Sequence, residues 1–89
     1  MDSELIFDGM TRNEIKIKIL EFKVHKKSIE DLLINLFNRI CDIEEMIKYV
    51  VCKEKLEDEK RGIVKLGKLY QTDLYQVKLD LWIYENLLK

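Results

Sequence analysis

The sequence predicts an all-α protein, and two features of its 89 residues lead to that class. Proline is absent and glycine occurs three times, so tight turns are scarce and long helices are favoured over a many-stranded fold. Apolar residues also recur at alternating spacings of four and three along most of the chain, which is the period of a coiled coil. We therefore expect a long helical hairpin or a three-helix bundle that assembles as a dimeric helical bundle.

The chain divides into a lead over residues 1–10, closed by Gly9, and a single helical domain over residues 11–89. Thr11 and Glu14 have the spacing of a capping box, in which each side chain satisfies the free backbone N–H of the other. This pattern predicts that the first helix begins near Thr11.

Two helices are expected, from Arg12 to Leu56 and from Ile63 to Leu88, with Gly62 supplying the turn after the charged stretch 53–61. We call the apolar row along each helix the seam. Its positions on the first helix are Ile15, Ile19, Phe22, Lys26, Ile29, Leu33, Leu36, Ile40, Ile43, Ile47 and Val50. On the second helix they are Ile63, Gly67, Tyr70, Leu74, Val77, Leu81, Tyr84 and Leu88.

Lys26 is the one charged residue of the first seam, and two alternatives follow from it. The helix either breaks near Lys26 or continues with a polar residue that marks the register. The expected helices would span about 67 Å and about 39 Å, so the first would outrun the second. Either the chain folds back into three helices or the overhang packs on a second copy, and we favour the homodimer. Segments 15–24 and 74–84 also contain the two-residue alternation of strands, but the seam favours helix there.

No pattern of residues indicates an enzyme, and we expect no catalytic residue, metal ligand or cofactor. His25 is the single histidine, and Cys41 and Cys52 are separated by about 16 Å along a helix, too far to bind one ion. We interpret His25 as facing solvent and both cysteines as small, partly buried hydrophobic residues. Few cysteines, no signal peptide and no apolar run near 18 residues predict a cytoplasmic protein without a membrane partner.

The back of the last helix is a candidate docking face for a partner protein, because apolar residues lie off the seam there at helical spacing. The residues of this face are Tyr75, Leu79, Trp82 and Ile83. The early helix repeats the pattern at Ile17, Leu20 and Val24. A helix that is apolar on two sides needs cover on both.

Charge is distributed unevenly along the first helix. Residues 12–27 include six basic and two acidic side chains, whereas residues 30–45 include five acidic and one basic. This arrangement suits antiparallel association, in which unlike charges meet. We expect a small non-enzymatic protein–protein interaction module, acting as a regulator, adaptor or assembly factor. The alternative is a nucleic-acid-binding helical dimer whose basic segment contacts phosphates through Lys16, Lys18, Lys23, Lys26 and Lys27.

Overall fold

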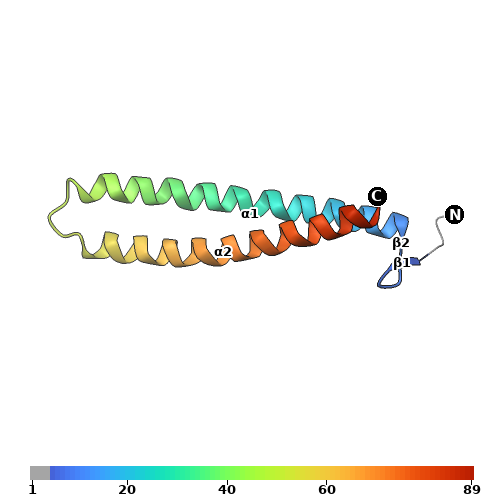
Figure 1. Ribbon diagram of the computed structural model, residues 1–89. Coiled ribbons are helices and arrows are strands. Elements are labelled where there is room, and N and C mark those ends of the chain that lie inside the picture. The colour runs from blue at the N-terminus through green and yellow to red at the C-terminus, as the bar shows by residue number, and fades with distance from the viewer. Residues whose placement is uncertain (1–4) are drawn as a thin grey trace.

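The structure, a computed structural model, describes residues 5–89 and is a hairpin of two long helices (Figure 1). Helix α1 spans Arg12–Ile47 and helix α2 spans Glu54–Leu87. They lie side by side and antiparallel, and the molecule measures 68 × 15 × 15 Å. Its radius of gyration of 19.6 Å far exceeds the value of about 12 Å for a compact domain of this length. The prediction of a helical hairpin is confirmed.

The start of α1 is the predicted one. Thr11 is the N-cap residue, and its hydroxyl accepts a hydrogen bond from the Glu14 N–H at 3.3 Å. The same hydroxyl donates to Glu14 Oε1 at 3.2 Å, so the Glu14 carboxylate contacts the Thr11 side chain and not the Thr11 backbone N–H that the capping box predicted. The helix then continues without a break through the polar stretch around Lys26, which is half-buried. The three-helix alternative is therefore wrong, as is the strand alternative for 15–24 and 74–84.

The turn between the helices was predicted in the wrong place. It occupies residues 48–53, and Gly62 lies inside α2. The segment 49–52 is Tyr-Val-Val-Cys, residue types with weak helix propensity, whereas the charged stretch that follows is rich in Glu and Lys, which form helices readily. Glu54 and Glu57 in the first turn of α2 further favour its start there, because carboxylates stabilise the positive end of the helix dipole.

This correction changes the expected helix lengths. With 36 and 34 residues, α1 and α2 span about 54 Å and about 51 Å, so each helix covers the other almost completely. No overhang remains, and the length argument for a second copy no longer holds. Val50, assigned above to the seam, lies beyond α1 and is exposed.

A small β-hairpin precedes α1 and was not predicted. Strand β1 (Leu5–Phe7) pairs antiparallel with β2 (Met10–Thr11). Asp8 and Gly9 form the two-residue loop with φ angles of 51° and 72°, the positive values that a type I′ turn requires. The Asp-Gly pair after three apolar residues is a sequence signal for this turn.

Aromatic rings join this β-hairpin to both helices at the end of the molecule where the C-terminus lies (Figure 1). The Tyr84 ring lies edge-on to Phe7 at 5.8 Å and to Phe22 at 5.2 Å, the T-shaped arrangement that aromatic pairs prefer. Arg12 Nη2 donates to the Leu88 carbonyl oxygen at 3.2 Å, which satisfies a free acceptor beyond the end of α2.

The core is a single row of contacts between the helices. The buried hydrophobic side chains are Ile15, Ile19, Ile29, Ile43 and Val77, all of them at seam positions. The remaining seam residues between Ile15 and Ile47, and between Ile63 and Leu88, are half-buried. Leu56 and Lys60 are half-buried too and extend the same spacing toward the turn. A hairpin of two helices thus buries one side of each helix.

Ile43→Ala should lower the free energy of unfolding by about 2–5 kcal/mol, because Ile43 is 0% exposed and its truncation leaves a cavity. The matched control is Ile34→Ala on the same helix, where the side chain is 57% exposed and the change should stay within about 0.5 kcal/mol. Urea unfolding followed by circular dichroism measures both. Equal losses in the two variants would contradict the observed burial.

Candidate interaction surface

The hairpin leaves a large apolar surface uncovered. Among residues 5–89, nineteen large hydrophobic side chains are exposed, whereas five hydrophobic side chains are buried. The accessible surface of the chain is 6909 Å², compared with about 5,500 Å² for a compact monomer of this mass. The difference, roughly 1,400 Å², is more than the approximately 800 Å² that one partner contributes to a standard interface. The extended hairpin therefore exposes more surface, polar and apolar together, than a compact chain of this mass.

The predicted docking face lies on the outer side of α2, near its C-terminal end. Tyr75 and Leu79 are exposed, and Trp82 is 64% exposed. Ile83 is half-buried, so it borders this face and does not project from it. The spacing of four and three from Tyr75 to Trp82 places the three exposed side chains in one row along the helix. An exposed tryptophan beside a tyrosine is typical of protein-binding surfaces.

A second exposed apolar row lies on α1 at the same end of the hairpin. Ile17, Leu20 and Val24 are all exposed, as the sequence predicted for positions off the seam. Each helix therefore has one apolar side facing its partner helix and another facing solvent.

A groove runs between the helices in the middle of the hairpin, with a volume of about 300 Å³. Leu36 and Phe37 of α1 and Val64 and Gly67 of α2 are among the residues that form its walls. An added Cβ at Gly67 would meet no atom within 4 Å, so this glycine opens the seam and does not serve a close approach of the helices. Phe37 lines the groove and is nevertheless exposed.

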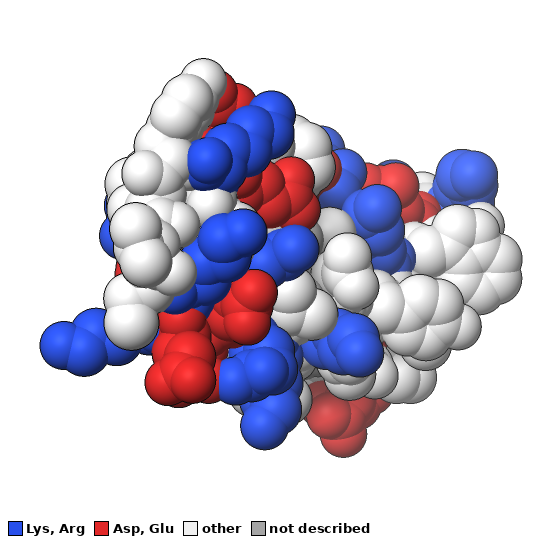
Figure 2. Space-filling view, turned by 90° about the vertical axis from the view of Figure 1, so that its left-hand side faces the viewer, with Lys and Arg blue, Asp and Glu red and all other residues white. Residues whose placement is uncertain are grey.

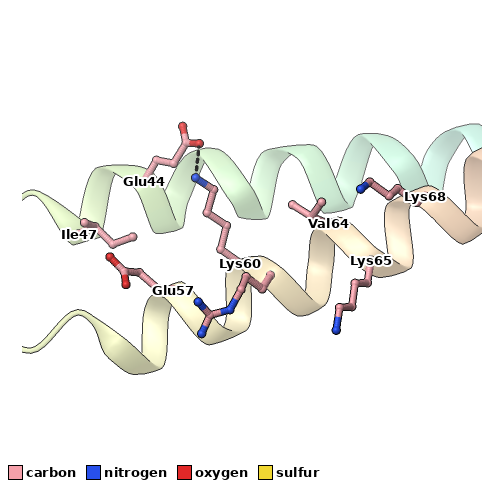
Figure 3. Close-up of a pocket in the computed structure, with 8 residues that line it drawn as sticks. Glu44, Ile47, Glu57, Lys60, Val64, Lys65 and Lys68 are labelled. Atoms are coloured by element: carbon pink, nitrogen blue, oxygen red, sulfur yellow. Dashed lines mark ion pairs between the residues drawn. The ribbon is translucent and has the colours of Figure 1, made fainter.

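Toward the turn, a second hollow of about 610 Å³ shares Val64 and Lys68 with this groove. Figure 3 shows Lys60 extending from α2 to Glu44 of α1, where the Nζ–Oε1 distance is 3.1 Å. Lys65 points away from α1 in the same view. The two hollows are therefore adjacent, and the one nearer the turn is lined mostly by charged side chains.

Further ion pairs either join the two helices or lie within one helix. Arg39 contacts Glu59 Oε1 through Nε and Nη2, both at 2.8 Å, and links α1 to α2. Lys48–Glu45 and Arg61–Asp58 are pairs within a helix or its cap. The end of the molecule at the turn shows basic and acidic side chains interspersed (Figure 2). Exposed pairs of this kind contribute up to about 1 kcal/mol each, so they select the register more than they stabilise the fold.

The five candidate lysines do not share one side of α1. Lys26 is half-buried at its seam position, and Lys18 pairs with Glu21 at 3.5 Å and lies over the Phe22 ring at 5.3 Å. Only Lys16 and Lys23 line a common hollow, together with Ile19, Leu20, Glu85 and Leu88.

Lys27, the fifth, donates a hydrogen bond to Asp31 Oδ1 at 3.0 Å. This hydrogen bond and the charge of Asp31 raise the pKa of Lys27 above 10.5, so the ammonium group stays charged at neutral pH. The pair stabilises the folded chain below about pH 10.5, and this stabilisation is lost as the pH rises through the raised pKa of Lys27.

The remaining polar candidates are isolated. His25 is exposed, as expected, and lies within the uninterrupted helix α1. Cys41 and Cys52 are free and exposed, so their expected partial burial is wrong. Cys41 lies off the seam, and Cys52 lies in the turn, which was predicted near Gly62. Across residues 5–89, no group of three or more His, Cys, Asp or Glu side chains is arranged to hold a metal ion.

Within the same described part of the chain, neither helix has the length and apolar character needed to cross a membrane. Comparison of the chain with protein families, with characterised proteins and with solved structures found no match. The candidate site is therefore defined by its geometry alone.

Replacing either internal glycine of α2 by alanine should stabilise the hairpin by about 0.5–1 kcal/mol, because alanine favours helix and the new methyl group meets no atom at either position. Gly62→Ala tests helix propensity at an exposed position, and Gly67→Ala tests it at the open seam position. Thermal unfolding measures the change. A loss of stability in Gly67→Ala with a gain in Gly62→Ala would show that the helices approach more closely at Gly67 than described.

Proposed function

We propose that this chain is a non-enzymatic protein–protein interaction module that acts as a regulator, adaptor or assembly factor. The observation that carries the proposal is the second apolar row on each helix, which the hairpin cannot cover by itself. Large exposed apolar patches on small proteins mark interaction sites, because leaving such area in water costs about 25 cal/mol per Å².

The docking face formed by Tyr75, Leu79 and Trp82, with Ile83 at its border, is the proposed site for a partner protein. It lies on the outer side of α2 and is not needed to hold the two helices together. A central aromatic side chain in such a face usually contributes most of the binding energy.

The seam is proposed to pack as an antiparallel coiled coil, and the module to work as a homodimer. Burial that follows the four-and-three spacing supports the first part. The exposed large hydrophobic side chains on the hairpin support the homodimer. We place the protein in the cytoplasm, where a reducing environment keeps exposed thiols such as Cys41 and Cys52 free.

Nucleic-acid binding through the basic residues 12–27 is the second candidate, supported by the excess of basic over acidic side chains in that segment. Such binding would weaken steeply with salt, because contacts to phosphates release counterions. Binding to an apolar docking face would change little over the same range of salt. A salt titration of any complex therefore distinguishes the two.

Trp82→Ala should abolish binding of the partner protein and leave the fold intact. Trp82 is 64% exposed. Its removal should therefore lower the free energy of unfolding by far less than the approximately 3–5 kcal/mol that is lost when a buried tryptophan is truncated. Its loss from a docking face should cost roughly 2 kcal/mol or more of binding energy. Crosslinking and affinity capture from cells, followed by mass spectrometry, compare the variant with the wild type.

Two controls make the result specific. Tyr49→Ala removes another exposed aromatic side chain, at the opposite end of the hairpin, and should retain the partner. Tyr84→Ala removes the ring that contacts Phe7 and Phe22, and should destabilise the fold. A Trp82→Ala variant that keeps the same partners, or that unfolds as readily as Tyr84→Ala, would reject the docking face.

A further inference from the structure

One side of the hairpin has the features of an interface with a second copy of the chain. We call it the groove face. On α2 it includes Glu57, Val64, Gln71 and Lys78, which follow one another at seven-residue spacing and so lie on the same side of the helix. On α1 it includes Lys27, Ile34, Phe37, Cys41 and Glu44, which occupy the neighbouring side at spacings of seven, three, four and three. The two adjacent hollows are lined, among others, by Phe37, Glu44, Glu57, Val64 and Gln71.

The middle of the groove face is apolar and open. Ile34 and Phe37 are exposed there, and Val64 lies across the groove from Phe37. The opposite side of the hairpin also has exposed apolar residues, among them Leu69. Ion pairs join the helices both beside the groove, at Lys60–Glu44, and elsewhere, at Arg39–Glu59, so these pairs do not distinguish the two sides. The groove face alone combines exposed apolar side chains with an opening between the helices at Gly67.

Charge decides how a second copy would lie on this face. The basic segment 12–27 is at the end of the hairpin with the C-terminus, and the acidic segment 30–45 continues toward the turn. A parallel second copy would place like charges together, whereas an antiparallel copy places the basic half of one chain beside the acidic half of the other. Unlike charges across an interface favour association and set its register.

The positions of the charged residues on the groove face define one register. The midpoint between Glu57 and Lys78 on α2 falls between Gly67 and Lys68, and the midpoint between Lys27 and Glu44 on α1 falls between Asn35 and Leu36. Leu36 and Gly67 line the same groove from opposite helices. A single two-fold axis can therefore lie in the interface at the level of this groove, perpendicular to the helices. About this axis, unlike charges meet on both α1 and α2.

We propose that two copies of this chain pair through their groove faces about that two-fold axis, antiparallel to each other, as a four-helix bundle. In this dimer Glu57 of one protomer meets Lys78 of its partner, and Lys27 meets Glu44. Ile34 and Phe37 of the two protomers face one another near the axis, and the two open grooves form a common apolar interior. The inference rests on the homodimer of the proposed function and adds its face, orientation and register.

Glu57 and Lys78 give the sharper test of register. They lie 21 residues apart on one helix, about 31 Å, so they cannot contact each other within a chain. Neither side chain has an ion-pair partner among residues 5–89, whereas Lys27 pairs with Asp31 and Glu44 pairs with Lys60. Reversal of the Lys78 charge should therefore affect only the dimer. Glu57→Lys also removes a carboxylate from the first turn of α2, so the helical circular dichroism of that variant is measured beside its dissociation constant.

Glu57→Lys and Lys78→Glu should each raise the dimer dissociation constant about tenfold or more, because each reversal juxtaposes two like-charged pairs per dimer. The double variant should return the constant to near the wild-type value. Sedimentation equilibrium at low ionic strength measures all four proteins, since salt screens exposed pairs. A double variant as weak as the single variants would overturn the proposed register.

Phe37→Glu tests the face. It places a charge beside the axis and should give a monomer of 10.7 kDa that keeps the helical circular dichroism of the wild type. Leu69→Glu is the control, because Leu69 and Phe37 are both 64% exposed but only Phe37 lines the groove. It should remain a dimer. Loss of the dimer in Leu69→Glu and its retention in Phe37→Glu would move the interface to the opposite side.

The outcomes separate this inference from the proposed function. A wild-type dimer that Phe37→Glu and the charge reversals leave unchanged overturns the inference and keeps the homodimer. A wild type that is a monomer at micromolar concentration overturns both the inference and the homodimer. Tyr75 and Trp82 lie three and four residues from Lys78 and so border the groove face. The dimer mass of Trp82→Ala is therefore measured beside its capture of partners, and the docking face is supported only if the variant loses the partner while it remains a dimer.

Discussion

The structure depends on one constraint, which is that two helices in contact can bury only one side of each other. The seam meets this constraint, because Ile15, Ile29 and Ile43 of α1 and Val77 of α2 are buried between the helices. Everything else that is apolar must remain on the surface of a hairpin 15 Å across. The protein has a second apolar row on both helices, so the isolated hairpin is an incomplete core. The proposed interactions follow from that surplus.

The order of the helices and the first cap could be predicted from the sequence, because the seam and the Thr11–Glu14 pair are local patterns. The turn could not be placed, since it lacks glycine and proline and is made by weak helix formers, while Gly62 is tolerated inside α2. The four-and-three spacing could have indicated an earlier start of α2, because Leu56 and Lys60 continue the α2 seam backwards from Ile63. An Asp-Gly turn signal in the lead was likewise present and was not used.

The candidate surface was predictable in part. Exposure of Tyr75, Leu79 and Trp82 follows from their distance from the seam, whereas Ile83 sits closer to the helix contact than its spacing suggested. The groove could not be predicted, because it depends on which residue of α1 lies opposite Gly67, and that register is set by the true position of the turn. A shift of the turn by several residues changes every pair across the hairpin.

The central claim is that the hairpin is completed by a second copy, so folding and association should be linked. The most direct test is the thermal unfolding midpoint of the wild-type protein over a hundredfold range of concentration. A dimer that dissociates on unfolding must have a midpoint that rises with concentration, by mass action. A sharp, fully reversible transition whose midpoint does not change over that range would show that association adds nothing to the stability of the hairpin and would contradict the account.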